Sequence, residues 1–217
     1  MSGAAFREND QLKSHLRALY RYRWSECGKK LIHYKIMTQT WPNTQNFQKS
    51  IPEGDDQIRQ QCTHCGFVDY QNPKIVVGSV ASWNEKILIC RRAIEPRKGF
   101  WTIPAGYLEL NETPEMGAVR EAREEACAQL QIDRLLAIYS VSRISQVQLI
   151  FRASLKTEKI APGIESLEAA LVDWDDIPWD DLAFPTVHWA LRHFDASRDK
   201  SDFPPFTNPH ETEGPGI

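Results

Sequence analysis

Three glutamates, Glu121, Glu124 and Glu125, follow one another at positions i, i+3 and i+4. On a helix this spacing places the three carboxylates on one face, within reach of one another. Like charges so placed repel. A divalent cation such as Mg²⁺, which is usually held by a few carboxylates together with phosphate oxygens, would offset them. The spacing therefore indicates a metal site that acts on a phosphate compound. The alternative is a solvated acidic helix face, which is what most charge runs are.

The residues around these glutamates carry the signals of a helix that begins after Thr113. Thr113 is a suitable N-cap, Pro114 suits the first helical position, and Glu115 places an acid in the first turn. A narrow apolar stripe beside the acidic positions consists of Ala118, Val119, Ala122 and Ala126. Because these side chains are small, we expect the stripe to pack closely against a sheet, with the acidic face turned toward a cleft.

A longer fixed spacing includes the same glutamates. Gly106 is followed after five residues by Glu112, and Glu112 after seven residues by Arg120-Glu121. This set is too specific for an ordinary acidic face, and it resembles the Nudix box, G-x5-E-x7-R-E-U-x-E-E-x-G-U, where U is aliphatic. Members of that family mostly hydrolyse a nucleoside diphosphate linked to another moiety, using Mg²⁺ or Mn²⁺. Cys127 departs from the pattern, which has glycine there. A left-handed cysteine would cost about 1 kcal/mol, so we expect the helix to run slightly further.

The resemblance extends over roughly residues 51–195. It is to the zinc-ribbon-containing Nudix hydrolases of bacteria, which are related to plant enzymes acting on FAD and ADP-ribose. Its segments include IPEGDD at 51–56, CTHCG at 62–66, WTIPAGYLE at 101–109 and PGIESLEAAL at 162–171. The resemblance implies an α/β fold, the Nudix α/β/α sandwich with a mixed sheet, and often a homodimer.

Residue patterns alone predict only a mixture of strands and helices in this region. A tight turn at Trp83-Asn84-Glu85 is expected to join the first two strands. The predicted strands cover residues 74–82, 86–92, 137–143, 147–153 and 169–174, and a closing helix covers 183–194.

Composition divides the chain into four parts. Residues 1–23 are expected to form an amphipathic helical extension, which packs on the body or a partner more often than on a membrane. Residues 24–70 form the zinc-ribbon-like segment, and residues 71–195 the Nudix hydrolase domain. Residues 196–217, rich in proline and polar residues, are expected to be a disordered tail.

A structural zinc site needs four ligands, commonly from two C-x-x-C knuckles. Cys62 and Cys65 form one suitable knuckle, whereas Cys27 has no cysteine partner three residues before it. His33 is a candidate substitute ligand. Three interpretations remain open: a Cys3His zinc site, a site completed by another chain, and a ribbon that has lost its metal.

Within the box, the resemblance implies that Glu121, Glu124 and Glu125 hold the catalytic metal and that the Gly106 carbonyl is a further ligand. Glu112 would either hold the loop before the helix or assist a second metal. Arg120 lies one helical turn before Glu124 and is expected to orient it.

A general base is expected from outside the box. Glu165 and Glu168 are the candidates, because related pyrophosphatases carry a working glutamate in the comparable segment. Glu165 is preferred, since a loop there could close over the bound metal. The alternative is that both are ordinary surface acids.

Substrate contacts are expected from cationic and aromatic residues before the box. Three arginines could bind phosphate oxygens. Two aromatic residues could stack on a base, although large aromatics near a glycine more often belong to the core. The candidates are Arg91, Arg92, Arg97, Trp101 and Tyr107.

Composition excludes several classes of protein. The formal net charge is −3, which argues against a nucleic-acid partner. No apolar run reaches the length of a membrane span, and the first residues lack the apolar core of a secretory signal. Five cysteines, an odd number, indicate a reducing compartment, and we expect a cytoplasmic protein.

Two functions remain open at this level. One is a metal-dependent hydrolase that cuts a nucleoside diphosphate derivative (FAD, ADP-ribose or an NADH-like compound) into two monophosphates. The other is a non-catalytic Nudix-fold module that senses a nucleotide. Sensors commonly lose the acidic residues of the box, and this chain keeps Glu112 and the three helix glutamates. The enzyme is therefore favoured.

Overall fold

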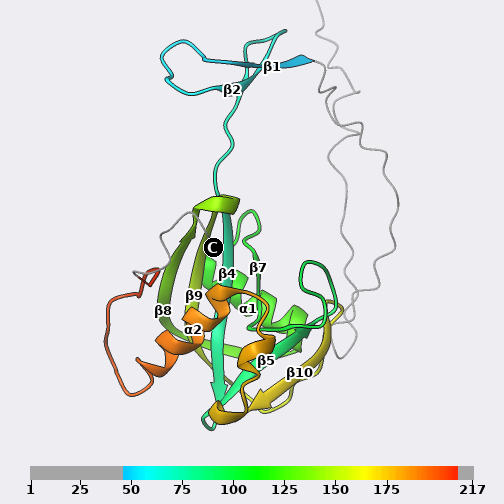
Figure 1. Ribbon diagram of the computed structural model, residues 1–217, viewed down its shortest axis with the longest axis vertical. Helices are drawn as coiled ribbons and strands as arrows, with labels where there is room; N and C mark the ends of the chain where they lie inside the picture. The colour runs from blue at the N-terminus through cyan, green and yellow to red at the C-terminus, as the bar shows by residue number, and fades with distance from the viewer. Residues whose placement is uncertain (1–45, 210–217) are drawn as a thin grey trace, which may run out of the picture.

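The computed structural model describes residues 46–209 and contains a small sheet and a large sheet. The N-terminal extension and the candidate zinc ligands Cys27 and His33 lie outside the described residues. Figure 1 shows the small sheet set apart from the body and joined to it by an extended segment. Its three antiparallel strands are β1 (Phe47–Ser50), β2 (Arg59–Cys62) and β3 (Val68–Asp69).

The large sheet has seven strands and is mixed. Its main order is β10-β5-β4-β9-β8, in which only the central pair β4–β9 is parallel; β6 pairs with β5 and β7 with β4. The strands are β4 (Lys74–Trp83), β5 (Lys86–Arg92), β6 (Trp101–Thr102), β7 (Ala105–Tyr107), β8 (Leu130–Val141), β9 (Gln146–Leu155) and β10 (Ser166–Val172).

The predicted hairpin at the start of this domain is confirmed. β4 and β5 are joined at Asn84 and Glu85, whose φ angles are 46° and 70°. Two successive residues with positive φ are the turn that matches the twist of a two-stranded hairpin. Asparagine accepts that conformation more easily than most residues, which explains why the chain turns there.

Two helices cover the two faces of the large sheet, α1 (Pro114–Ala126) and α2 (Pro185–Asp195) (Figure 1). The predicted α/β sandwich is therefore confirmed. The fully buried Ala122 and Ala126 let α1 lie close to the sheet. The opposite face buries larger side chains, among them Leu136 and Tyr139 of β8, against Leu191 and other residues of α2. Single 3-10 turns lie at Ser142–Ile144, Trp174–Asp176 and Trp179–Asp181.

The start of α1 agrees with the sequence, and its end does not. Thr113 Oγ1 accepts a hydrogen bond from the Met116 N–H at 3.3 Å, as expected of an N-cap. The helix stops at Ala126, and Cys127 adopts the left-handed conformation with φ 50°. The expectation that the helix continues past this point is wrong. Cys127 adopts the left-handed conformation that glycine has at many helix ends. For a residue with a side chain, this conformation costs about 1 kcal/mol.

The expectation of a disordered tail is also wrong for residues 196–209. Phe206 exchanges backbone hydrogen bonds of 2.9 Å with Leu136 and Ile138 of the edge strand β8. The Asn208 side chain binds both backbone groups of Ser140. The ring of Phe206, like that of Phe203, packs against the α2-side core. A proline-rich composition is compatible with this extended course, because the segment gains its order from the sheet edge rather than from its own hydrogen bonds.

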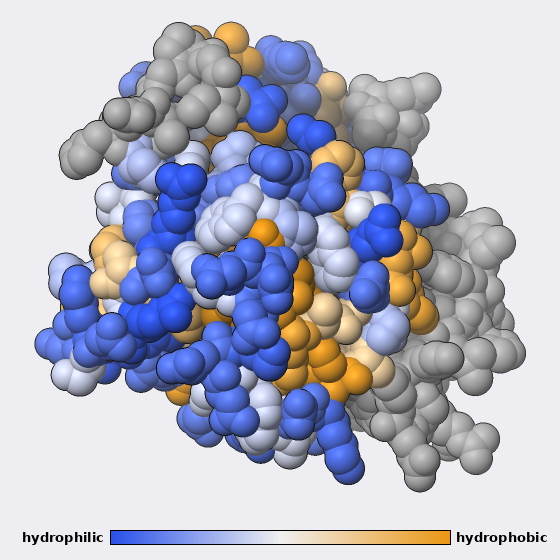
Figure 2. All heavy atoms as spheres, turned by 60° about the horizontal axis from the view of Figure 1, so that its bottom comes forward, coloured by the Kyte–Doolittle hydropathy of each residue, from blue (hydrophilic) through white to orange (hydrophobic). Residues whose placement is uncertain are grey.

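The surface is largely polar. Figure 2 shows polar side chains over most of the end of the molecule that lies at the bottom of Figure 1, with apolar residues visible between them. In the part of the chain that the structure describes, no helix is both long and apolar enough to cross a membrane.

Candidate functional site

The acidic face of α1 lies under the loops that precede and follow it. Glu121 and Glu125 are buried, with exposed fractions of 8% and 6%. Glu125 Oε2 accepts a hydrogen bond from the Ala105 N–H of β7 at 3.1 Å. Glu124 projects outward, with 40% of its side chain exposed. The helix therefore presents two enclosed carboxylates and one open carboxylate.

The two enclosed carboxylates resist ionisation. Burial, followed by the charge of Glu121, raises the pKa of Glu125 to about 8. Burial is also the main reason that the pKa of Glu121 is raised. A buried anion is unfavourable, and a second anion beside it adds to a cost that Arg120 offsets only in part, at Glu121. Such a pair favours the binding of a positive charge.

The Glu121 carboxylate occupies the space that a side chain at position 106 would fill. A Cβ atom on Gly106 would lie 2.5 Å from Glu121 Oε1, inside any permitted contact. The backbone of β7 can pass this close to the carboxylate only because position 106 has no side chain. The glycine of the box is thus explained by the packing of β7 on α1.

Arg120 gathers the acids of the box around one guanidinium. Its Nε and Nη2 bind both oxygens of Glu112, at 3.0 and 2.7 Å. Its Nη1 lies 2.6 Å from Glu121 Oε1 and 3.1 Å from Glu124 Oε2. The bond from Arg120 is the main reason that the pKa of Glu112 is lowered. Glu112 also accepts the Glu109 N–H at 2.8 Å, so it holds the loop before the helix, as one of the two expectations stated.

We expect the Arg120→Lys variant to lose about tenfold to a hundredfold in kcat/KM, the usual effect of removing a group that orients a ligand. Lysine keeps the charge but cannot form the forked contact with Glu112 and reach Glu121 and Glu124 as well. Steady-state kinetics would measure the loss. The matched control is Arg123→Lys on the exposed side of the same helix. Wild-type kinetics in Arg120→Lys would contradict the orienting role.

The loop from 156 to 165 closes over the C-terminal end of α1. The Ala161 and Gly163 N–H groups donate to the carbonyls of Ala126 and Glu125, at 2.9 and 3.0 Å. A Cβ on Gly163 would collide with the carbonyl oxygen of Glu124. This contact brings Glu165, two residues further along the loop, close enough that its charge raises the pKa of both Glu121 and Glu125.

Glu168 is placed differently from Glu165. It lies on the edge strand β10, paired in register with Arg91 after an irregularity at Ser166. It is not among the groups that shift the pKa of the two buried glutamates. The structure therefore brings Glu165, rather than Glu168, toward the acidic face of α1.

The predicted substrate contacts lie at different distances from this face. Arg92 lies near enough to lower the pKa of Glu125 slightly, and its guanidinium lies 5.2 Å from the centre of the Phe184 ring. Arg91 donates to the Gly99 carbonyl at 2.9 Å, and Arg97 lies over the Phe100 ring in the same loop. Trp101 packs against the α2-side core, as the alternative for large aromatics stated. Tyr107 is 50% exposed beside Gly106.

The donor set fits a hard divalent cation, because it consists of carboxylates beside a backbone that can approach closely. In residues 46–209, however, no three acidic, cysteine or histidine side chains already converge as metal ligands. The contacts of Arg120 explain this arrangement. Its Nη1 is a positive group held between Glu121 and Glu124, in the position where the two carboxylates attract a cation.

The ribbon holds half of a thiolate site in the described residues. Backbone N–H groups of Cys65 and then His64 lower the pKa of the Cys62 thiol. Gly66, with φ 76°, closes the turn by donating to the Cys62 carbonyl at 2.9 Å. Cys62 and Cys65 are both free thiols. Their partners in a zinc site would come from outside the described residues or from another chain.

Sequence reasoning assigned no role to Ala105 and Gly163. The Ala105 N–H binds Glu125, and Gly163 permits the loop to lie on α1. The pair Pro162-Gly163 is a turn signal that could have pointed to the second contact. The first contact has no signal in the sequence, because any residue type supplies a backbone N–H.

Comparison with known proteins places the chain in a known family. The family model of the NUDIX domain matches residues 72–198, and the model described as Nudix N-terminal matches residues 44–71. The crystal structure of a NUDIX hydrolase from Nitrosomonas europaea is 40% identical, with a TM-score of 0.70, over 85% of this chain and 97% of that chain.

Curated relatives match over shorter stretches. A MutT-like protein of Streptomyces ambofaciens is 37% identical over 101 residues, which are 46% of this chain and 60% of the relative. An ADP-ribose pyrophosphatase of Methanocaldococcus jannaschii is 28% identical over 113 residues, which are 50% of this chain and 67% of the relative. The chain thus spans about two thirds or less of the curated relatives that it matches.

Proposed function

This chain belongs to the Nudix family, and we propose that it is a metal-dependent hydrolase that cleaves the pyrophosphate bond of a nucleoside diphosphate derivative into two monophosphates. The observation that carries this proposal is the enclosed carboxylate pair Glu121 and Glu125. Their burial and mutual repulsion favour a bound cation at the position where the box requires one.

Each residue of the site has a task in this reaction. Glu121, Glu124 and Glu125 would hold Mg²⁺ or Mn²⁺, with the Gly106 carbonyl as a further donor. When bound, the metal would neutralise phosphate oxygens and so expose phosphorus to attack by water. Arg120 keeps the carboxylates oriented while the metal and the substrate exchange.

The arginines at the end of β5 and in the β5–β6 loop would bind the substrate's phosphates. Arg92 lies beside Phe184 and its charge acts on Glu125, so its guanidinium is a candidate contact for a phosphate oxygen near the carboxylates. Arg91 is the preceding residue of β5, and Arg97 lies within the loop that follows. Tyr107, exposed beside Gly106, is a further candidate contact.

Glu165 is proposed as the general base that takes the proton of the attacking water. We expect Glu165→Gln to lower kcat by about a hundredfold to ten-thousandfold, the usual range for a lost base. Glu168→Gln, three residues away on β10, is the matched control and should stay within about threefold of the wild type. The pH dependence of kcat separates a base from a structural residue, because only loss of the base should flatten the rise of kcat with pH. Equal losses in both variants, or a large loss in Glu168→Gln alone, would contradict the assignment.

The proposed substrates are ADP-ribose, FAD and NADH-like dinucleotides, all of which contain the same pyrophosphate. One relative bears the name ADP-ribose pyrophosphatase, which supports ADP-ribose as the first compound to assay. The free thiols of the described residues are compatible with the expected reducing, cytoplasmic location, and we also propose a homodimer and a zinc ion on the ribbon.

A substrate panel tests the proposal. Purified protein is incubated with each compound and Mg²⁺ or Mn²⁺, and the products are separated by anion-exchange chromatography. We expect at least one compound to yield two monophosphates in equal amounts. A folded protein that cleaves none of them, or that cleaves one equally well in excess chelator, would overturn the proposal.

A further inference from the structure

A cavity of about 670 Å³ lies beside the first two turns of α2. Its lining includes Arg97 from the β5–β6 loop and Phe184, His188, Trp189, Arg192 and His193 from the region of α2. We call this the α2 cavity. Its volume is within the range of about 300–1,000 Å³ that is typical of small-molecule sites.

The charge of the α2 cavity distinguishes it from the rest of the surface. Two arginines line it, together with two histidines whose pKa values burial lowers toward the neutral form, and no aspartate or glutamate does. This is unusual in a chain whose net charge is −3. In the described part of the chain, neither Arg97 nor Arg192 forms an ion pair, so both guanidinium groups remain available to an anion.

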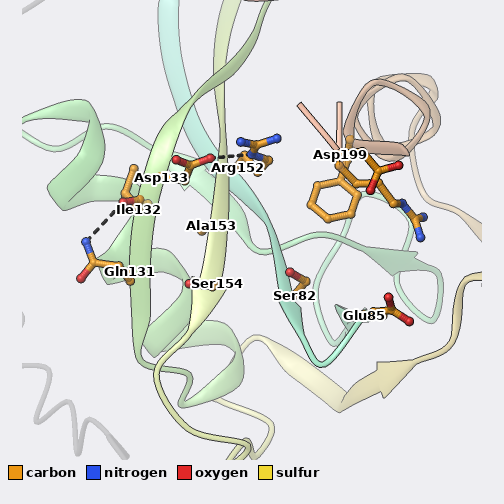
Figure 3. A pocket seen from close by; sticks show the side chains of 11 residues that line it. Ser82, Glu85, Gln131, Ile132, Asp133, Arg152, Ala153, Ser154 and Asp199 are labelled. Atoms are coloured by element: carbon orange, nitrogen blue, oxygen red, sulfur yellow. Dashed lines mark hydrogen bonds and ion pairs between the residues drawn. The ribbon is translucent and has the colours of Figure 1, made fainter. Parts of the chain in front are cut away.

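A second cavity, of about 610 Å³, is a useful contrast (Figure 3). Its lining contains Glu85, Asp133 and Asp199 beside Arg152 and Arg198. Figure 3 shows Arg152 joined to Asp133, and the same guanidinium also binds the carbonyls of residues 197 and 200. The charges of this cavity are therefore largely satisfied within the protein, and it presents no free cation to a phosphate.

Arg92 lies beside the α2 cavity, and its charge also acts on the acidic face of α1. The guanidinium of Arg92 lies 5.2 Å from the centre of the Phe184 ring, which lines the cavity. The same guanidinium acts on Glu125. The loop that follows Arg92 is tied to the loop of Glu165 by a 2.8 Å bond from the Ala93 N–H to the Glu165 carbonyl. A ligand whose phosphate lies beside Arg92 can therefore extend into the cavity.

The lining also offers flat apolar surfaces. The rings of Phe184 and Trp189 are half-buried and pack on the α2-side core, which holds them in place. Rigid aromatic faces next to cationic groups suit a ligand that combines a flat base with a phosphate, because the base can stack on the rings while the phosphate binds the cations. A bare phosphate would use only the arginines.

We propose that the α2 cavity binds the nucleoside monophosphate moiety of the substrate, with its base against Phe184 and Trp189 and its anionic part near Arg97 and Arg192. This inference deepens the proposed function and rests on it for the identity of the whole substrate. It does not rest on hydrolysis, because a nucleoside monophosphate should bind without being cleaved.

The test is the binding of AMP to the full chain in excess chelator. Calorimetry and the quenching of tryptophan fluorescence measure this binding. We expect the Arg97→Ala/Arg192→Ala double variant to bind AMP at least about tenfold more weakly, since it removes the charged hydrogen bonds to the phosphate. Lys98→Ala, in the same loop but outside the lining, is the matched control and should bind normally. Ribose 5-phosphate, which lacks a base, should bind at least about tenfold more weakly than AMP.

Two further measurements keep the outcome unambiguous. His188→Gln is a second, milder variant that should also weaken AMP binding, and thermal melting shows whether each variant is folded. If a substrate has been found, the double variant should raise KM at least about tenfold, because it removes contacts that bind the substrate.

A folded wild type that does not bind AMP, or a double variant that binds it normally, would overturn the inference. Equal affinity for ribose 5-phosphate and AMP would show a phosphate site only, which also overturns it. A third outcome is that AMP binds through these arginines but the protein hydrolyses no compound. This result would support the α2 cavity as a nucleotide site and overturn the proposed function.

Discussion

Glu125→Gln is expected to lower kcat/KM about a thousandfold or more while the protein stays folded. Glutamine has the shape of glutamate and can still accept the Ala105 N–H, so the contact between β7 and α1 remains. It lacks the negative charge that holds the cation. Each factor of ten in rate corresponds to about 1.4 kcal/mol, and a bound metal contributes several kcal/mol to stabilising the charge of the transition state.

Steady-state kinetics at saturating Mg²⁺ would measure this loss, and the same assay on Glu124→Gln tests the open carboxylate. Glu115→Gln, in the first turn of the same helix and away from the site, is the control and should keep near-wild-type activity. Unchanged hydrolysis in Glu125→Gln or Glu124→Gln would contradict the mechanism.

The metal-free wild type is expected to lose stability as the pH rises from about 5 to about 8. The pKa of Glu125 is raised from its ordinary 4.5 to about 8, so in this window the folded protein holds a proton that the unfolded chain has released. Stability therefore falls with rising pH until the folded protein also loses the proton. Since one pKa unit corresponds to about 1.4 kcal/mol, the loss from Glu125 is at most about 5 kcal/mol.

Denaturant unfolding at a series of pH values, in chelator, would measure this slope. Glu125→Gln cannot ionise, so at pH 8 the metal-free variant should be more stable than the wild type, although it is inactive. Mg²⁺ should raise the melting temperature of the wild type much more than that of the variant. His188 and His193, whose pKa values burial lowers, act in the opposite direction at low pH, and the difference between the two proteins removes their contribution. If the free energy of unfolding changes with pH in the same way in both proteins, the raised pKa of Glu125 is contradicted.

Local signals explain which elements the sequence predicts well. The start of α1 depends on Thr113 and Pro114, which act within one turn, and the β4–β5 hairpin depends on two turn residues. The common face of the glutamates follows from helical spacing alone. Such features need no knowledge of distant parts of the chain.

Features that depend on distant contacts were not predictable. The spacing of Glu121, Glu124 and Glu125 does not show that two are enclosed and one is open. Strand β7 at Ala105 and the loop at Gly163 decide this. The order of Phe206 depends on the free edge of β8, about 70 residues earlier in the chain.

Two further features had no local signal. The conformation of Cys127 follows from the way the next strand leaves α1, and it overrides the preference of cysteine. The α2 cavity combines Arg97 with residues of α2 that lie almost 100 positions later. Neither the strand's path nor this combination can be read from the residues alone.

A Mn²⁺ titration tests the central claim most directly, because it measures cation binding without a substrate. Electron paramagnetic resonance detects the ion that remains free at each point of the titration. The wild type should bind Mn²⁺, and the Glu121→Gln/Glu125→Gln double variant should bind it at least about tenfold more weakly. Glu115→Gln should bind as the wild type does. Equal Mn²⁺ affinity in the wild type and the folded double variant would contradict the claim that these two buried carboxylates form the metal site.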